Sequence, residues 1–108
     1  MKVYHVYIMA SLTRRLYIGS TSALMRRAAQ HRTGYFKGHT SLYRIHSLVY
    51  FEQVATAAAA VARERQLKGW TRERKMRLVE TANPGWRDLA ADWPIPPVPP
   101  PPESPRGQ

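Results

Sequence analysis

The sequence predicts a small α+β fold in which two strands, a helix, a third strand and two more helices follow one another. Two observations predict this order. Three short runs rich in β-branched and aromatic residues have the composition of strands, and a polar segment of hairpin length separates the first two runs. The remaining segments begin with Ser or Thr, which cap helices, and glycine follows two of them, where it ends a helix.

The three predicted strands differ in what surrounds them. Residues 3–9 and 16–20 are the first two strands, and the polar residues 11–15 join them as a hairpin. Residues 47–54 are the third strand. The segment 35–46 before it mixes glycine with polar and aromatic residues, so it is expected to be a loop that carries contacts.

The first helix is predicted between the hairpin and this loop, ending at Gly34. Three consecutive residues offer an N-cap for it: Ser20, Thr21 and Ser22. Within the helix, Arg27 and His31 are four residues apart, so their side chains lie on one edge. Both side chains can therefore reach one target.

The second and third helices follow the third strand. Thr56 caps a helix over residues 57–68, whose alanine run has the highest helix propensity available, and Gly69 ends it. Thr71 caps a third helix over residues 71–82, which carries several cations on its outer faces. That charge run is also typical of a solvated surface.

Glu64 is the most informative residue of the second helix. It shares one face with Ala57, Val61 and Lys68 by helical spacing, so the sequence places it on a mostly apolar stripe. A carboxylate on such a stripe costs free energy unless a cation or a metal ion meets it. An exposed Glu64 paired with Lys68 is the alternative.

The formal net charge of +10 is concentrated in the N-terminal half of the 108 residues. Eight Lys and Arg and no Asp or Glu lie between Met1 and Phe51, whereas nine cations and seven anions lie from Glu52 onward. A half without anions favours a polyanionic partner, so we expect nucleic acid. A merely soluble basic surface is the alternative, and a membrane surface is disfavoured because the cations do not line one face of a long helix.

Several classes of protein are excluded or disfavoured. The absence of cysteine excludes disulfides, thiolate zinc sites and a cysteine nucleophile. The spacing of His5, His39 and His46 argues against any other zinc site. No segment has the apolar run of a signal peptide or the ~18 apolar residues of a membrane span, so we expect a cytoplasmic protein. We expect no small organic cofactor.

The composition changes at Pro94. Residues 1–93 are expected to form one domain, and residues 94–108, rich in proline, a disordered tail that favours polyproline II and cannot build a core. A ligand for an aromatic groove is the alternative interpretation of this tail.

The order of five chemically active positions resembles the GIY-YIG nuclease superfamily, over about residues 2–93. These positions are Tyr7, Tyr17 within Tyr17-Ile18-Gly19, Arg27, His31 and Glu64. The resemblance is strongest to the small stand-alone bacterial branch, and residues 37–41, 48–52, 62–70 and 83–89 support it.

Two positions depart from the family pattern. The first motif reads His5-Val6-Tyr7 and lacks its glycine. Other branches carry a late asparagine near the metal, for which Asn83 is the only candidate here; Asn83-Pro84 is otherwise typical of a turn.

The resemblance implies a three-stranded antiparallel sheet flanked by helices, in the order ββαβα with a further C-terminal helix, which agrees with the elements predicted above. It also implies that Tyr7 and Tyr17 stand side by side on the hairpin, that Arg27 and His31 project from the first helix, and that Glu64 binds one divalent ion, Mg²⁺ or Mn²⁺.

General chemistry supports these roles. Mg²⁺ takes oxygen ligands and tolerates a single protein carboxylate, so Glu64 beside a substrate phosphate is a sufficient site. The fork of Arg27 pairs two phosphate oxygens at once. We expect Tyr17 to act as general base or to position the water, with Tyr7 and His31 in its hydrogen-bond network, although His31 is the easier base by its intrinsic pKa. Nucleic-acid contacts are further expected from Arg14, Arg26, Lys37, His39, Arg63 and Lys68.

We therefore expect a metal-dependent endonuclease that hydrolyses phosphodiester bonds of nucleic acid, with DNA as the expected substrate. Its expected process is repair or single-strand processing. The main alternative is a binding module that has kept the scaffold and lost turnover. A protein-interaction adaptor acting through the proline-rich tail is the third interpretation.

Overall fold

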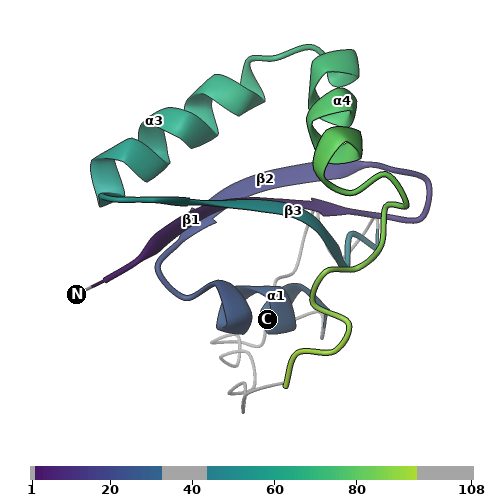
Figure 1. Cartoon of the computed structure of the whole chain (residues 1–108), viewed down its shortest axis with the longest axis horizontal. Helices are drawn as coiled ribbons and strands as arrows, with labels where there is room; N and C mark the ends of the chain where they lie inside the picture. Colours follow the sequence, from purple (N-terminus) through teal and green to yellow (C-terminus); the bar gives the residue numbers. More distant parts are fainter. Residues whose placement is uncertain (1, 33–43, 95–108) are drawn as a thin grey trace, which may run out of the picture.

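A computed structural model describes residues 2–32 and 44–94 and confirms the predicted α+β architecture. The elements follow in the order β1 (Tyr4–Ala10), β2 (Leu16–Thr21), α1 (Leu24–Arg32), β3 (Ser47–Val54), α3 (Ala57–Lys68) and α4 (Arg72–Ala82), as Figure 1 shows. The predicted end of the first helix at Gly34, most of the predicted loop and the tail from residue 95 lie outside the described residues.

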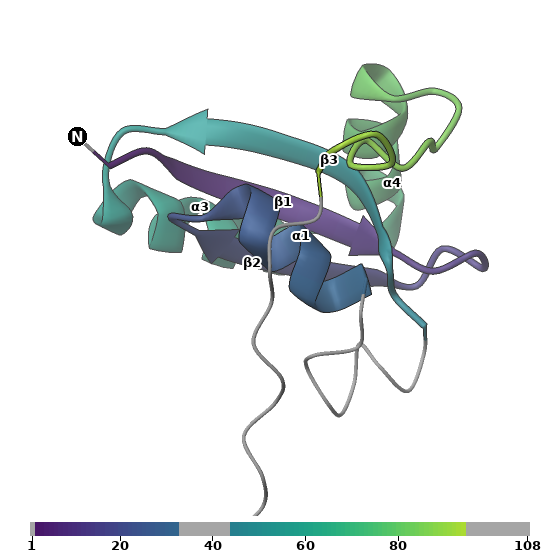
Figure 2. The ribbon, with the colours of Figure 1, turned by 90° about the horizontal axis from the view of Figure 1, so that it is seen from below.

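The sheet has the strand order β2-β1-β3, and both pairs are antiparallel. Figure 2 shows β1 between its two neighbours, so β2 and β3 are the edges of the sheet. In this register Tyr7 of β1 stands opposite Gly19 of β2 and opposite Phe51 of β3. The central strand therefore carries Tyr7 into the middle of the molecule, where its side chain is 1% exposed.

The two faces of the sheet are covered by different elements. Helices α3 and α4 lie on one face, and α1 lies on the other (Figures 1 and 2). Because side chains alternate along a strand, β1 contributes to both cores. The core under α3 and α4 contains Val6, Ile8, Ala10, Ile18, Val49, Ala60, Leu67 and Val79. The core under α1 contains Tyr7, Met9, Leu24, Ala28, Ile45, Leu48 and Ala90.

Helix α3 begins and ends where the sequence predicts, but it buries a different face. Thr56 accepts a hydrogen bond from the Ala59 amide, which confirms it as the N-cap. The buried residues are Ala60 and Leu67, whereas Val61 is 44% exposed. The predicted apolar stripe through Ala57, Val61, Glu64 and Lys68 is therefore wrong. Alanine lies on every side of the first turn, so the sequence offers little apolar contrast to choose the buried face.

Asn83 anchors the chain after α4. Its side-chain amide donates to the carbonyls of Val49 (3.1 Å) and Arg87 (2.8 Å), and its oxygen accepts from the Arg87 amide. These bonds hold the end of α4 against β3. The structure thus uses the Asn83 side chain to join main-chain segments, in agreement with its interpretation as a turn residue.

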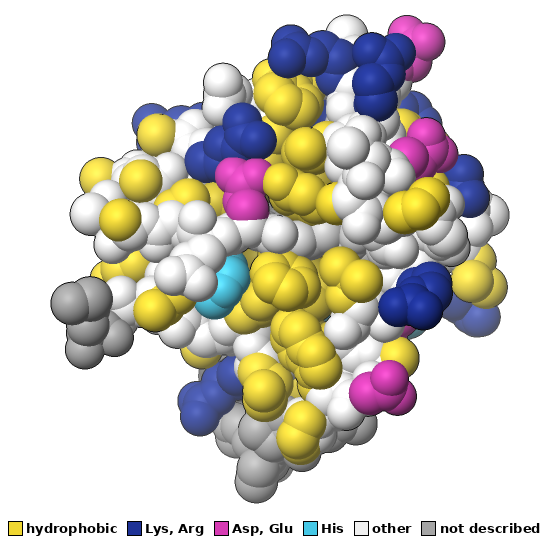
Figure 3. All heavy atoms as spheres, viewed as in Figure 1, with side chains coloured by type: hydrophobic (Ala, Val, Ile, Leu, Met, Phe, Trp, Pro, Cys, Tyr) yellow, Lys and Arg dark blue, Asp and Glu magenta, His cyan; other side chains and the backbone are white. Residues whose placement is uncertain are grey.

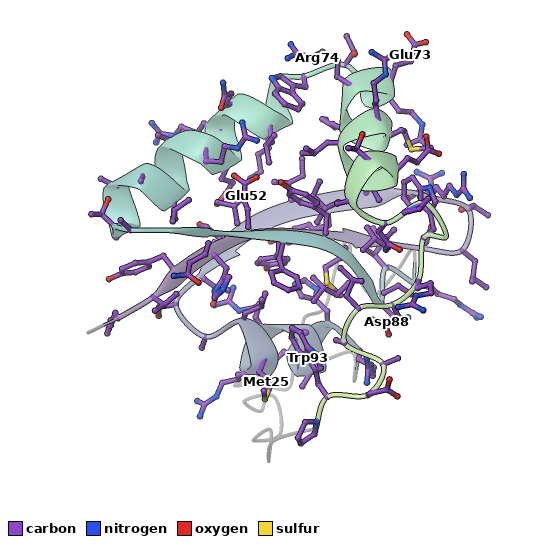
Figure 4. The ribbon with its side chains drawn as sticks, viewed as in Figure 1. Met25, Glu52, Glu73, Arg74, Asp88 and Trp93 are labelled. Carbon is purple, nitrogen blue, oxygen red and sulfur yellow. The ribbon has the colours of Figure 1, made fainter. Side chains whose placement is uncertain are left out.

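A second anchor fixes α1. The carboxylate of Asp88 accepts from the Leu48 amide (3.1 Å) and from Arg32 at the end of α1 (2.8 Å). Figure 4 shows Met25 and Trp93 close together below the sheet, and both line a small pocket there. These contacts hold α1 in place and with it the residues that it presents.

No helix in residues 2–32 and 44–94 is long and apolar enough to cross a membrane.

Candidate active site

The phenol of Tyr7 lies directly across Gly19. A Cβ atom added at Gly19 would stand 2.6 Å from the Tyr7 hydroxyl oxygen and 2.7 Å from Cζ. Glycine at this position therefore leaves the space that the ring occupies. Because β2 is an edge strand, the ring carries the hydroxyl of a buried residue of the central strand out to the edge of the sheet.

Three aromatic rings and one guanidinium gather around this hydroxyl. The ring centroids of Tyr7 and Tyr17 are 6.3 Å apart, and the His31 ring lies 5.8 Å from Tyr7 and 5.1 Å from Tyr17. The Tyr7 hydroxyl is 3.2 Å from Nε2 of His31 and accepts a hydrogen bond from Arg27. The hairpin and α1 thus bring together four of the five residues that the sequence singled out.

Both titratable groups in the middle of this cluster are held neutral. Burial, the charge of Arg27 and the neighbouring His46 lower the pKa of His31 to about 4. Burial and the adjacent Tyr17 raise the pKa of Tyr7 well above its usual range, although Arg27 opposes this. A consistent assignment at neutral pH has the Tyr7 hydroxyl accepting from Arg27 and donating to Nε2 of His31. Tyr7 is therefore a neutral hydroxyl here, and His31 is its acceptor.

Glu64 reaches the same edge of the sheet from the opposite face. On α3 the buried direction runs through Ala60 and Leu67, so Glu64 and Arg63 flank it on either side. Glu64 points to the β2 edge, where Ser20 donates a hydrogen bond to Oε1 (2.6 Å). Lys68 donates to Oε2, also at 2.6 Å. The pair with Lys68 is the alternative that the sequence left open.

The Glu64 carboxylate is ionised in this setting. Burial by itself would raise its pKa, but the hydrogen bonds from Lys68 and Ser20 and the charges of Lys68 and Arg65 outweigh burial, so the pKa lies below its usual value. The charge of Glu64 also acts on the Tyr7 phenol, where it favours the protonated form. Glu64 is therefore an electrostatic neighbour of the aromatic cluster, joined to it across the Gly19-Ser20 stretch of β2.

The oxygen atoms of Glu64 are suitable ligands for a single hard cation. Each oxygen of Glu64 accepts one hydrogen bond, and a carboxylate oxygen has two lone pairs, so each keeps one for a further partner. Among the described residues, no group of three or more His, Asp or Glu side chains could hold a metal ion together. One carboxylate with water and phosphate oxygens matches the way in which Mg²⁺ is commonly bound.

The structure places Arg63 away from this site. Its guanidinium bonds Glu52 through Nε (2.6 Å) and Nη2 (3.2 Å), and Nη1 bonds Gln66 (2.8 Å). In Figure 4, Glu52 lies between the sheet and α3. The same guanidinium lies 5.3 Å from the Trp70 ring. Arg63 thus supports the packing of α3 on β3, and its expected contact with nucleic acid stays a prediction.

The face viewed in Figure 3 is also unlike a continuous cationic surface. Hydrophobic side chains form a band between α3 and α4 and across the sheet, while cations gather near the meeting point of the two helices. The β3 edge of the sheet lies toward the viewer in this view. The candidate site lies at the opposite, β2 edge, which faces away from the viewer.

Two other predicted contacts with nucleic acid, Arg14 and Arg26, have different surroundings. Arg14, at the hairpin tip, lies over the Trp86 ring (4.5 Å) and 3.8 Å from Glu80, so it fastens the hairpin to α4 and to the turn after this helix. Arg26 is exposed on α1 beside Arg27. The predictions for Lys37 and His39 lie outside the described residues.

Sequence reasoning missed the two residues that connect the halves of the site. Gly19 was part of a motif without a stated function, and the register of the hairpin could have placed it opposite Tyr7. Ser20 was interpreted as a helix cap, but its hydroxyl donates to Glu64. Just before α1, Thr21 accepts a hydrogen bond from the Ala23 amide at 2.9 Å. No local signal links Ser20 to a residue 44 positions away.

Comparison with known proteins identifies the family of this chain. The sequence model of the GIY-YIG catalytic domain matches residues 3–77. A UPF0213 protein of Haloquadratum walsbyi is 39% identical over 85 residues, which cover 74% of this chain and 91% of the relative. The UPF0213 proteins of Natronomonas pharaonis and Staphylococcus haemolyticus are 34% and 31% identical over 80 residues, covering 70% and 74% of this chain and 89% and 98% of theirs.

The fold is shared with a solved structure as well. The solution NMR structure of a UPF0213 protein from Bacillus halodurans superposes with a TM-score of 0.52 at 22% identity, covering 83% of this chain and 97% of that protein. The matched model includes the hairpin, α1 and Glu64, which carry the site described above. The chain therefore belongs to the GIY-YIG catalytic-domain family.

Proposed function

We propose that this chain is a metal-dependent nuclease that hydrolyses phosphodiester bonds, with DNA as the expected substrate. One observation carries the proposal. An ionised carboxylate, a guanidinium and two tyrosine side chains converge at the β2 edge of the sheet, although they come from four separate elements. A protein that only bound nucleic acid would need the cations, but not this arrangement around them.

Arg27 is proposed to bind the scissile phosphate. Its guanidinium stays charged and presents paired donors that match phosphate oxygens, so it stabilises the negative charge that builds up during attack. Its hydrogen bond to Tyr7 fixes the guanidinium beside the other groups. The phosphate is thus held next to the tyrosine hydroxyls.

Glu64 is proposed to hold the divalent ion, with substrate and water oxygens completing its shell. An ion bound there would polarise the phosphate and stabilise the leaving oxygen. Ser20 keeps the carboxylate at the β2 edge through its hydrogen bond to Oε1.

Tyr17 is proposed to accept a proton from the attacking water or to orient this water. Tyr7 suits this role less well, because its pKa is raised and its hydroxyl already bonds His31 and Arg27. His31 is neutral at pH 7 and accepts from Tyr7, so it orients the Tyr7 phenol beside Tyr17. The role of general base or of water-positioning residue is thereby assigned to Tyr17, the less buried of the two tyrosines.

The proposal is tested with labelled single- and double-stranded oligonucleotides, in Mg²⁺, Mn²⁺ or EDTA, using the full chain. We expect cleavage that requires the metal. Glu64→Gln should lower the rate at least about 100-fold while leaving oligonucleotide affinity nearly unchanged. Glu73→Gln removes the same charge from an exposed site at the start of α4 and should cleave normally (Figure 4).

Two outcomes would contradict this assignment. Equal turnover in Glu64→Gln and the parent would remove Glu64 from the site. Salt-sensitive binding without cleavage in any of the metals would instead favour the non-catalytic binding module.

A further inference from the structure

The two hydrogen bonds to Glu64 are alike in length but differ in charge. Ser20 is a neutral hydroxyl that donates to Oε1 from β2, and Lys68 is an ammonium that donates to Oε2 from the next turn of α3. The Lys68 side chain is 54% exposed, whereas that of Glu64 is 22% exposed. Ser20 thus belongs to strand β2 at the site, whereas Lys68 is an exposed side chain of α3.

These two donors respond differently to a cation at Glu64. A neutral hydroxyl on one oxygen still leaves lone pairs for a metal, and such a bond orients the ligand. An ammonium within hydrogen-bond distance of the same carboxylate would stand only a few ångströms from the bound ion, where like charges repel strongly. The ammonium loses little by moving, because an exposed ion pair contributes little stability.

We propose that Lys68 is an exchangeable counter-ion of Glu64 that leaves Oε2 when a divalent cation binds, and that Ser20 is the positioning residue that holds the carboxylate throughout. This inference rests on the proposed function, because it takes Glu64 as the metal ligand. In the metal-free protein Lys68 neutralises the carboxylate and competes with the ion. The metal affinity of Glu64 is therefore set by two residues: Ser20, which orients the carboxylate, and Lys68, which competes with the ion.

Arg65 provides a matched control for the competition. It carries the same charge, lies next to Glu64 in α3 and acts on the carboxylate through space, but it is exposed and is not hydrogen-bonded to Glu64. A general effect of positive charge should be similar for Arg65 and Lys68. Direct competition for Oε2 should appear only at Lys68.

The experiment titrates the full chain, free of nucleic acid, with MnCl₂ and follows free Mn²⁺ by electron paramagnetic resonance. We expect Lys68→Met to tighten Mn²⁺ binding about 3- to 5-fold, as for loss of one exposed ion pair, and Arg65→Met to change it less than about 2-fold. Ser20→Ala should weaken binding about 10-fold, and Ser20→Thr, which keeps the hydroxyl, should restore it. Circular dichroism checks that each variant is folded.

The outcomes separate this inference from the proposed function. If Glu64→Gln binds Mn²⁺ as tightly as the parent, the proposed metal site is wrong and the exchange falls with it. If the parent binds no Mn²⁺ without nucleic acid, the exchange in the free protein is wrong. If Glu64→Gln removes binding but Lys68→Met leaves the affinity unchanged, weakens it or matches Arg65→Met, only the exchange is wrong. Unchanged affinity in Ser20→Ala would overturn the positioning role of Ser20.

Discussion

Replacing Gly19 with alanine is expected to displace the Tyr7 phenol and to damage the candidate site without unfolding the protein. The new Cβ would meet the Tyr7 hydroxyl oxygen at 2.6 Å and Cζ at 2.7 Å. Ordinary contacts between such atoms lie near 3.5 Å, so the ring must move by about 1 Å. Gly19 lies in strand β2 with no positive φ angle, so the substitution tests space and not backbone freedom.

The expected loss of activity comes from this displacement. The Tyr7 hydroxyl is already 3.2 Å from Nε2 of His31, and a further shift of about 1 Å takes it beyond hydrogen-bond distance. A misplacement of about 1 Å commonly lowers the rate of an enzyme about 100-fold, which corresponds to about 2.7 kcal/mol. We expect a decrease of that size in metal-dependent cleavage for Gly19→Ala.

The expected loss of stability is smaller. Overpacking costs about 1–3 kcal/mol, and the reduced freedom of the unfolded chain returns about 0.4–1 kcal/mol when glycine becomes alanine. The free energy of unfolding should therefore fall by about 1–2 kcal/mol. Urea unfolding measures this change in the same samples that are assayed for cleavage.

Two further variants make the test specific. Gly69→Ala is the control, because its Cβ would lie 3.5 Å from the nearest atom and its φ of −81° suits alanine; it should keep both activity and stability. Tyr7→Ala removes the ring that Gly19→Ala would strike. In that background Gly19→Ala should no longer destabilise the protein.

A readout that does not depend on activity completes the design. The imidazole nitrogens of His31, followed by NMR, should shift in Gly19→Ala because Nε2 loses its partner. If Gly19→Ala keeps full activity and the His31 signals of the parent, the Tyr7 phenol does not occupy the space over residue 19, and the reasoning is refuted.

Two other predictions concern stability and the residues around the site. The pKa of His31 is about 6.5 in the unfolded chain and about 4 in the folded protein. Between these two values the unfolded state binds more protons than the folded state. The free energy of unfolding should therefore fall as the pH drops through this window, by about 3 kcal/mol in all. Urea titrations from about pH 7.5 to about pH 3.5 measure this fall, and an equally steep dependence in His31→Gln would speak against His31 as its source. Arg63→Met removes the bonds to Glu52 and should cost about 1–2 kcal/mol of stability while leaving the salt dependence of oligonucleotide binding unchanged. A salt slope lower by about one would instead make Arg63 a phosphate contact.

Local features of the sequence were enough to predict the elements of this fold. Thr56 and Thr71 cap their helices as expected, each accepting a hydrogen bond from a main-chain amide. The third strand and the second helix have the predicted bounds. Caps, turns and strand composition act over a few residues, which is why they can be recognised without the tertiary structure.

The aromatic part of the site was predictable for a related reason. Arg27 and His31 lie one helical turn apart, and Tyr7 and Tyr17 flank one hairpin, so short-range geometry and the family resemblance together indicate that they meet. Glu64 was harder, because the predicted stripe on α3 does not face the core, and only its pairing with Lys68 followed from helical spacing. Packing of Ala60 and Leu67 on the sheet turns Glu64 toward β2 and Arg63 toward Glu52 on β3.

By itself, the sequence determined the order of the elements and the anion-free first half, since each depends on composition or on spacing within one element. Only the tertiary structure decided that the Tyr7 phenol passes over Gly19, that Ser20 holds Glu64, and that Arg63 serves packing. Those contacts depend on strand register and on the direction in which a helix packs. Both are settled by burial of the whole core and not by neighbouring residues.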